Sequence, residues 1–445
     1  MSLPQYPKYK NSGVEWLGSM PETWTTRRMK TLFEIRKRIA GQEGFDVLSI
    51  TQKGLKVKDI DSNDGQLAMD YSNYQFVEPG DFAMNHMDLL TGWVDIASAS
   101  GVTSPDYRVF STRSPGTIHD RYYLYLFQNA YKQRIFYAFG QGASQLGRWR
   151  LPTEQFNDFV VPFPPITEQV AISNFLESEL VKIDALVEEQ RRLIELLKEK
   201  RQAVISHAVT KGLNPGAPMK PSGIDWLGDV PASWAVGRLS DVCISIDTGP
   251  FGTSLKSDDY IDDGTPVINP SHIVDSRIVP ESKVTVSEET AEKLSRWRLI
   301  QGDLVVARRG EVGRAALVLE ANHSWICGTG SLRVRPFCDK ILGSYVAIVL
   351  QSGFARQWLE LASVGSTMFN LNERILGALP MVFPRSLEEQ RETIEQMNLE
   401  LGKVDTLIAE ANGAIGLLHE RRSALISAAV TGKIDVRASV TECVA

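Results

Sequence analysis

A long-range internal repeat is the feature that most restricts how this chain can fold. The segment SGVEWLG at residues 12–18 returns as SGIDWLG at residues 222–228. A proline and a tryptophan follow each copy at identical spacing, as Pro21, Trp24, Pro231 and Trp234. The two copies lie much farther apart than one solenoid period, which indicates duplication of a whole folding unit. We expect the repeated tryptophans to be packing anchors.

A second repeated block has the pattern of a long amphipathic helix. Glu168-Gln169 returns as Glu389-Gln390, and AVISHAVT at residues 203–210 returns as ALISAAVT at residues 424–431. At ~1.5 Å per residue, a continuous helix from Gln169 to Lys211 would be about 65 Å long. The sequence therefore predicts one long helix in each half of the chain.

Apolar residues recur in both helical blocks at heptad-like spacing, which is typical of a coiled-coil seam. The expected seam residues are Leu176, Ile183, Leu186, Leu193, Leu197, Val204, Val404, Leu407, Ala411, Ala414, Leu418 and Leu425. A long helix with a narrow apolar stripe needs a partner, and the equally patterned partner is its own duplicate. Because two copies of one unit tend to pack about a twofold axis, we expect the helices to be antiparallel.

The segments outside the helices mix short β-rich runs with glycine, aspartate and proline turns, which favours an α+β fold. The sequence thus predicts two globular domains joined by two long antiparallel coiled-coil helices, with internal pseudo-twofold symmetry. The expected divisions are an N-terminal segment 1–18, a first globular domain 19–164, a first spacer helix 165–213, a linker with the repeated motif 214–228, a second globular domain 229–384, a second spacer helix 385–434 and a C-terminal tail 435–445.

Composition and charge exclude several classes of protein. Of the 445 residues, 43% are hydrophobic and 23% are charged, which is ordinary for a globular protein. The N-terminus lacks the apolar core of a signal peptide, and no apolar run approaches the ~20 residues of a membrane span, so we expect a cytoplasmic protein with no membrane contact. The net charge of −6 argues against a non-specific nucleic-acid binder, so any basic face must be local.

Common catalytic and metal-binding motifs are missing from the sequence. The six histidines lack HExxH spacing, and the four cysteines lack CxxC spacing. Gly432-Lys433 precedes Ile434, so it does not form a phosphate-binding loop. Asn269-Pro270 precedes Ser271, so it lacks the aromatic residue that an amino-methyltransferase tetrad needs. We therefore expect no catalytic residue, no bound metal and no cofactor in this chain.

Nearly the whole chain resembles the specificity subunit of type I restriction-modification systems. The resemblance rests on the repeated W-L-G…P…W motif, the Phe-Pro and Glu-Gln pairs that begin each helical block, and the A-x-I-S-x-A-V-T sequence that ends it. It implies that each globular domain is a target-recognition domain, which reads one half of a split, asymmetric DNA site. It also implies that the paired helices set the spacing between the two halves.

The resemblance further implies a set of partners. These are double-stranded DNA, two modification subunits that methylate adenine with S-adenosylmethionine, and two restriction subunits that use ATP and Mg for translocation and cleavage. The specificity subunit itself has no catalytic centre in this family. Because both helical blocks are net acidic, we expect them to contact protein partners rather than DNA.

Residues that read bases have to be sought in the loops that differ between the two domains. Arg and Lys pair well with guanine, Asn and Gln with adenine, and small hydroxyls with either. The candidates are Thr51, Gln52, Lys53, Asn85, His86, Gln145 and Arg148 in the first domain, and Asn269, Ser271, His272, Arg308, Arg309, Arg314, Thr367 and Asn370 in the second. For the three arginines, contact with phosphate or simple solvation is the alternative interpretation.

Two other functions remain as alternatives. One is a self-contained DNA nuclease or methyltransferase with an unrecognised active site, which activity of the chain alone would support. The other is a duplicated coiled-coil adaptor for protein partners, which absence of sequence-selective DNA binding would support.

Overall fold

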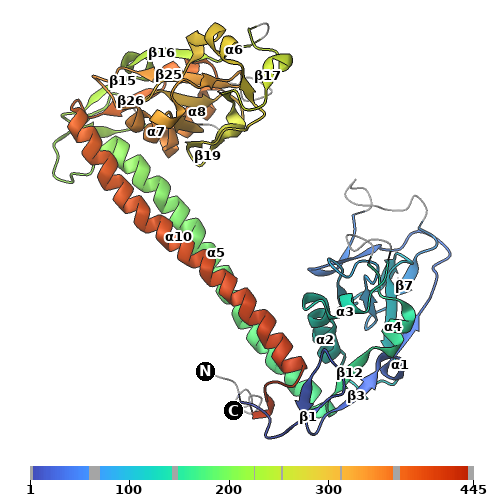
Figure 1. Ribbon diagram of the computed structural model, residues 1–445. Helices are drawn as coiled ribbons and strands as arrows, with labels where there is room; N and C mark the ends of the chain where they lie inside the picture. Colours follow the sequence, from blue (N-terminus) through green and yellow to red (C-terminus); the bar gives the residue numbers. More distant parts are fainter. Residues whose placement is uncertain are drawn as a thin grey trace. The chain divides into compact units, whose positions relative to one another are not determined.

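The computed structural model describes residues 4–59, 71–142, 149–224, 226–251, 254–310, 313–363 and 371–438. The chain divides into two compact units, Met1–Gln190 with Gly413–Ala445, and Arg191–Asn412. Each unit contains a globular α+β part and portions of two long helices, α5 (Ile166–Lys211) and α10 (Leu387–Val430) (Figure 1).

The first unit is built on a four-stranded antiparallel sheet in the order β4-β11-β8-β9. These strands are Phe33–Arg36, Arg108–Thr112, Phe82–Met84 and Val94–Ile96. Helix α2 (Asp120–Lys132) buries Tyr122, Tyr123 and Phe127 in the same core as the sheet. The remaining elements are β1 (Tyr9–Asn11), β2 (Ser19–Pro21), β3 (Thr25–Arg28), α1 (Met29–Leu32), β5 (Leu48–Thr51), β6 (Gly54–Val57), β7 (Gln75–Val77), β10 (Gly101–Thr103), α3 (Ile135–Ala138), α4 (Thr153–Asp158) and β12 (Val160–Phe163).

The second unit contains a corresponding sheet in the order β16-β25-β22-β23. These strands are Cys243–Thr248, Ser331–Pro336, Leu304–Ala307 and Ala315–Leu317. Helices α7 (Gly343–Gln351), α8 (Gly353–Ala362) and α9 (Glu373–Gly377) share its core. A further sheet, β17-β21-β18-β24, has no counterpart among the described strands of the first unit.

The other elements of the second unit are mostly short. They are β13 (Met219–Pro221), β14 (Asp229–Pro231), β15 (Ala235–Arg238), η1 (Leu239–Val242), η3 (Ser257–Asp259), β17 (Tyr260–Ile261), β18 (Thr265–Ile268), η4 (Pro270–His272), β19 (Ile273–Val274), β20 (Arg277–Ile278), β21 (Thr285–Val286), α6 (Glu288–Lys293), η5 (Ser295–Trp297), η6 (Glu320–Asn322), β24 (Ile326–Cys327) and β26 (Pro380–Phe383).

The two halves share their strand pairing as well as their sequence motifs. Strand β3 pairs with β12, and β15 pairs with β26 in the same antiparallel register. The hairpins β1-β2 and β13-β14 also match, because Tyr9 pairs with Pro21 in the first and Met219 pairs with Pro231 in the second. The four-stranded sheets place corresponding strands in corresponding order. The fold therefore confirms the duplication that the sequence predicts.

The repeated tryptophans at Trp24 and Trp234 are buried anchors, as expected. Trp24 is fully buried, and its indole Nε1 donates a 2.8 Å hydrogen bond to Oε2 of Glu168. Trp234 donates the equivalent 2.7 Å bond to Oε1 of Glu389. Each tryptophan thus ties its globular part to the first turn of the long helix that follows it. The other repeated tryptophan differs between the copies, because Trp16 stacks on Phe159 while Trp226 is half exposed.

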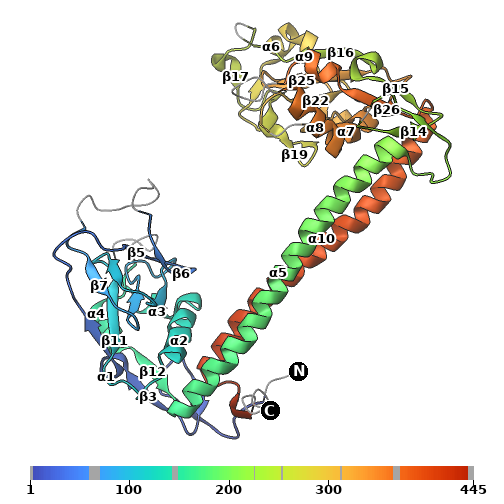
Figure 2. The same cartoon turned by 180° about the vertical axis from the view of Figure 1, so that it is seen from behind.

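The long helices run antiparallel within each unit. In the first unit, Ile172 and Ile183, both in the first half of α5, share a cluster with Leu425 near the end of α10. In the second unit, Ile205 near the end of α5 packs with Met397 near the start of α10. Figure 2 shows the two helices side by side, as does the view from the other side. Both long helices and their antiparallel pairing are confirmed.

The seam between the helices is partly different from the predicted one. Leu176, Ile183, Leu197, Val404, Ala411 and Leu425 are buried, and Val204, Ala414 and Leu418 are half-buried. Leu186, Leu193 and Leu407 are 44%, 42% and 46% exposed, so assigning them to the seam was wrong. The adjacent apolar residues Val187, Ile194 and Ile408 take the inward positions instead.

The physical reason lies in pairs of adjacent apolar residues. Successive residues on a helix point about 100° apart, so only one member of each pair can face the partner helix. The alternating spacing of three and four residues that continues from Ile183 selects Val187, and the spacing from Val404 selects Ile408.

In the described part of the chain, no helix is long and apolar enough to cross a membrane.

Candidate nucleic-acid interface

Corresponding strand ends in the two units form two equivalent surface hollows. Strand β8 leads to His86, and the backbone N–H of Leu151 donates a 2.9 Å hydrogen bond to the carbonyl of His86. Strand β22 leads to Arg308, and the N–H of Leu371 donates a 2.9 Å bond to the carbonyl of Arg308. In both units a backbone hydrogen bond from a leucine therefore holds a later segment of the chain against the residue that follows the corresponding strand. We call these the His86 hollow and the Arg308 hollow.

The His86 hollow has a volume of about 270 Å³ and is rich in hydrogen-bond donors. Its lining residues are His86, Arg108, Gln141, Arg150, Leu151, Pro152 and Thr153. Arg108 is only 4% exposed, and its guanidinium lies 4.5 Å from the ring centroid of Phe156. One terminal nitrogen of Arg108 donates to the carbonyl of Leu151 at 3.0 Å, while the other has no hydrogen-bond partner among the described residues.

The electrostatics of this hollow keep His86 neutral. Burial, followed by repulsion from Arg108 and Arg150, lowers the pKa of His86 to about 3. Burial likewise lowers the pKa of Arg108 to about 10, so the guanidinium remains charged at neutral pH. The Nδ1 atom of His86 is buried and has no hydrogen-bond partner in the described structure. The hollow therefore presents cationic donors beside a neutral imidazole, which suits the acceptor groups of nucleic acids.

The Arg308 hollow is larger, about 800 Å³, and has a different lining. The residues that line it are Thr248, Phe251, Arg308, Arg309, Thr329, Gly330, Asn372, Glu373 and Arg374. Nε of Arg308 donates a 3.1 Å hydrogen bond to the carbonyl of Leu371, which holds its guanidinium next to that residue. Arg309 is exposed, and Phe251 is 66% exposed. This surface offers several cationic donors and one exposed aromatic ring.

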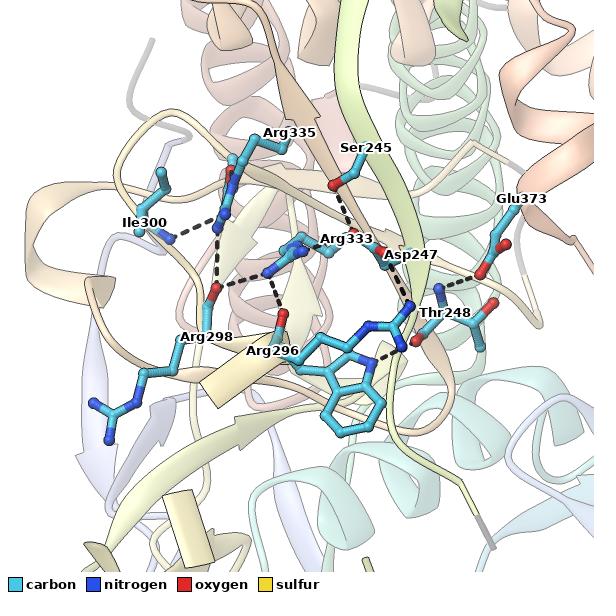
Figure 3. A network of polar contacts seen from close by, with 11 residues as sticks. Ser245, Asp247, Thr248, Arg296, Arg298, Ile300, Arg333, Arg335 and Glu373 are labelled. Atoms are coloured by element: carbon cyan, nitrogen blue, oxygen red, sulfur yellow. Dashed lines mark hydrogen bonds and ion pairs between the residues drawn. The ribbon is translucent and has the colours of Figure 1, made fainter. Parts of the chain in front are cut away.

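Thr248 and Glu373, which line the Arg308 hollow, belong to a polar network whose contacts Figure 3 draws. The N–H of Thr248 donates to Glu373 at 2.7 Å, which joins the end of β16 to the start of α9. Behind it, Arg333 donates to Asp247 at 2.6 Å and to the carbonyl of Arg296 at 2.7 Å. Because Arg333 is only 6% exposed in its side chain, this ion pair is shielded from water. The network reaches the hollow through Thr248 and Glu373, which both line it, and it positions Glu373.

The candidates in the β5–β6 hairpin lie at its tip. The hydroxyl of Thr51 donates to the carbonyl of Gly54 and accepts from the N–H of Lys53, so Thr51 serves the turn itself. Gln52 donates a 3.3 Å bond to the carbonyl of Thr91, and Lys53 is exposed. Gln52 is exposed as well, so both side chains at the tip are accessible, whereas Thr51 is half-buried.

Other candidates are used within their own domains. Asn85 caps a local turn, since its side-chain oxygen accepts from the N–H of Met87 at 3.3 Å. His272 is 2% exposed, and its Nδ1 accepts from the N–H of Asn269 at 3.3 Å. Nominating His272 as a base reader was therefore wrong, because its ring stabilises a short helical turn inside the domain. Ser271, next to it, is exposed.

Several candidates cannot be placed in either hollow. Arg314 is half-buried and does not line the Arg308 hollow. Gln145, Arg148, Thr367 and Asn370 lie outside the described residues.

The sequence did not single out several lining residues. Arg108 and Arg150 line the His86 hollow, and Phe251, Glu373 and Arg374 line the Arg308 hollow. One signal was available, because Leu151 and Leu371 precede a short helix in each half. Aligning the halves on these leucines would have indicated Arg150 and the Asn372-Glu373 pair. Arg108 is a strand residue, and no local pattern distinguishes it.

Comparisons with known proteins agree with this architecture. The family model of the type I restriction modification DNA specificity domain matches residues 231–398. The chain is 23% identical over 322 residues to the type I restriction enzyme EcoBI specificity subunit of Escherichia coli, covering 70% of this chain and 67% of that protein. It is 20% identical to the putative type I restriction enzyme MjaX specificity subunit of Methanocaldococcus jannaschii, covering 98% and 99% of the two chains.

Solved structures share the fold at low sequence identity. A chain from a structure concerned with complex assembly and conformational transition of the type I R-M system has a TM-score of 0.66 and 14% identity, covering 92% of this chain and 98% of that one. The HsdS subunit from Thermoanaerobacter tengcongensis has a TM-score of 0.52 and 15% identity, covering 93% and 98%. With the duplicated α+β units and the antiparallel helices, these matches show that the chain is similar to type I restriction-modification specificity subunits, in a matched specificity domain, in sequence over most of its length and in fold.

Proposed function

We propose that this chain is a non-catalytic, cytoplasmic DNA-specificity subunit whose two units each read one half of a split, asymmetric site. The observation that carries the proposal is the pair of equivalent hollows at His86 and Arg308. They are built at matching strand ends but lined by different side chains. A shared scaffold with different linings suits two different half-sites, because base identity is read by side chains in the grooves.

The partners in this proposal are double-stranded DNA, two adenine-modification subunits and two restriction subunits. S-adenosylmethionine, ATP and Mg belong to those partner subunits, and this chain binds none of them. Exposed leucines on the long helices support docking of two identical modification subunits. Leu186 and Leu196 on α5 are exposed, as are Leu407 and Leu417 at the equivalent positions of α10. Exposed apolar residues that recur symmetrically are typical of a surface that binds a repeated partner.

The direct test is single-molecule methylation sequencing of DNA from a host that expresses this chain with its modification subunit. The expected result is a split motif with methylated adenine, which neither protein produces alone. Methylation by this chain alone would instead support an enzyme, and a stable complex without sequence-selective methylation would support a protein-binding adaptor. Failure to form any complex with an authentic modification subunit would overturn the docking proposal.

A substitution in one hollow tests whether that hollow reads only one of the two half-sites. Arg309→Ala should relax the motif at one position of a single half-site, because a good bidentate contact discriminates by about 1–3 kcal/mol. Arg391→Ala, on α10 beside Glu388, is the matched control and should leave the motif unchanged. If R309A weakens methylation equally at all sites, Arg309 contacts phosphate rather than a base.

The spacing role of the helices can be tested by length. One heptad inserted into each helix, after Arg192 and after Gly413, preserves the seam pattern. Seven residues at ~1.5 Å add about 10 Å, so the spacer should lengthen by about three base pairs at ~3.4 Å each. Both half-sites should remain the same. An unchanged spacer would contradict the spacing role.

A further inference from the structure

A third hollow, in addition to the His86 and Arg308 hollows, lies in the first unit and is lined by four separate segments. It has a volume of about 590 Å³. The hairpin tip at Gln52 and Lys53 forms one wall, and the turn at residues 90–93 forms another. The end of α2, from Gln128 to Arg134, and the last third of α10 complete it. We call it the Lys132 hollow.

Positive charge gathers in this hollow with little to balance it. Lys53, Lys132, Arg134 and Arg422 all line it. Arg422 forms an ion pair with Asp184, but no carboxylate among the described residues pairs with the other three. Burial lowers the pKa of Lys132, and repulsion from Arg422 lowers it further, while Asp184 acts in the opposite direction. The hollow therefore holds like charges close together, which an anion would stabilise.

A buried donor in the same hollow lacks a partner. Asn129 is 3% exposed, and its side-chain nitrogen has no hydrogen-bond partner in the described structure. Its neighbour Gln128 differs, since its amide nitrogen donates to the carbonyl of Val94 at 3.2 Å. A buried amide donor left unsatisfied costs about 1–3 kcal/mol, so a ligand that accepts its hydrogen bond would recover this energy.

Helix electrostatics alone do not account for this arrangement. Lys132 lies in the last turn of α2, where the partial negative charge of the helix end favours a cation. That effect falls off within one turn, however, and does not explain Lys53 on a distant hairpin or Arg422 on α10. Arg134 also adopts a left-handed backbone, with φ of 54°, which an arginine rarely does.

The described residues of the second unit do not repeat the feature. Tyr122 and Tyr345 are equivalent residues of α2 and α7, both fully buried. At the same offset, Asn129 corresponds to Ser352, which is fully buried, and α7 ends at Gln351 whereas α2 continues to Lys132. The hydroxyl of Ser352 donates to the carbonyl of Val349. The charged hollow is therefore an addition to the first unit rather than part of the shared scaffold.

We propose that the Lys132 hollow binds a backbone phosphate of the DNA, held between the recognition domain and helix α10. Donors that converge from four segments suit a phosphate, which has several acceptor oxygens in different directions. The proposal rests on the proposed function, because it assumes that the chain binds DNA. It also changes the expectation that the acidic helices avoid DNA, since Arg422 of α10 would contribute directly. Such a contact positions the duplex without reading sequence.

The test measures how DNA affinity depends on salt for the complex with its modification subunit. Lys132→Met with Arg134→Asn removes two charges, and asparagine tolerates the left-handed backbone at position 134. The double variant should reduce the slope of log K against log salt by about one unit. It should weaken binding to the methylated motif and to random-sequence duplex by the same factor. Asn129→Asp, which places a negative charge in the hollow, should weaken both further.

The control removes the same charge elsewhere. Lys403→Met with Arg391→Met acts on two α10 residues that pair with Glu400 and Glu388, and the salt slope should not change. If wild-type complex shows no salt-dependent DNA binding, the proposed function itself fails. If wild type binds but the Lys132 double variant keeps the full slope, the phosphate site is overturned. Loss of the modification subunit with an unchanged slope would identify an acidic protein segment as the occupant and would equally overturn it.

Discussion

The Nε atom of Arg201 on α5 lies 3.2 Å from Oδ1 of Asp405 on α10. The equivalent residues form the reciprocal pair, because Arg422 on α10 bonds Asp184 on α5. Arg201 corresponds to Arg422, and Asp184 corresponds to Asp405, in the repeated helical blocks. This exchange is what an antiparallel pair of duplicated helices requires, and it occurs once in each unit.

These ion pairs should specify register more than stability. Because both are partly exposed, Arg201→Ala should lower the free energy of unfolding by only about 0.5 kcal/mol. Reversing one residue, as in Asp405→Arg, should cost more, since it opposes two cations. The double exchange R201D with D405R should restore most of the loss. Urea denaturation of wild type, R201D, D405R and the double exchange forms the cycle, and additive effects would show that the two residues do not interact.

The corrected seam makes a prediction about two adjacent residues. Ile194→Ala should lower the free energy of unfolding by about 2 kcal/mol or more, because Ile194 is 8% exposed and truncation leaves a cavity. Leu193→Ala is the matched control and should cost less than about 0.5 kcal/mol, since Leu193 is 42% exposed. Denaturant melts of the two variants check this. Equal losses would contradict the seam.

Glu168 and Glu389 should differ in importance although they are equivalent. Oε2 of Glu168 accepts hydrogen bonds from Trp24 and from the hydroxyl of Tyr6, both at 2.8 Å. Glu168→Ala would leave two buried donors without an acceptor, at a cost of about 2–4 kcal/mol. For Glu389, one such bond is described, from Trp234, so Glu389→Ala should cost about half as much. Calorimetry would reveal which unit unfolds earlier in each variant, and an identical loss would contradict the comparison.

His86 should make the first unit sensitive to mild acid. Its pKa is about 3 in the folded protein, below its ordinary value of 6.5. As pH falls below 6.5, His86 binds a proton in the unfolded chain but stays neutral in the folded chain. The free energy of unfolding therefore decreases between pH 6.5 and pH 3. His86→Gln removes this titration. The decrease in unfolding free energy from pH 7 to pH 5 should therefore be smaller in H86Q, while His119 remains in both proteins as an internal control.

The long-range organisation could be predicted from the sequence because it is written in local patterns. Heptad spacing and a constant offset between the copies predict two long helices and a duplicated scaffold without knowledge of any contact. The same patterns were insufficient for the seam. At Leu186-Val187 and Leu193-Ile194 both neighbours are apolar, and only the partner helix determines which of them is buried. The outward leucines then become the exposed residues that support partner docking.

The candidate interface was predictable only in outline. The sequence by itself determined the duplicated α+β units and the antiparallel helices, since heptad spacing, glycine turns and β-rich runs act over a few residues, and the base-reading residues stay a prediction. Tertiary structure alone decided that Arg108 reaches a hollow from a strand, that His272 is enclosed within its domain, and that Lys53, Lys132 and Arg422 meet. The reason is physical: whether a polar side chain faces solvent, a carbonyl or a like charge depends on segments far away in the chain.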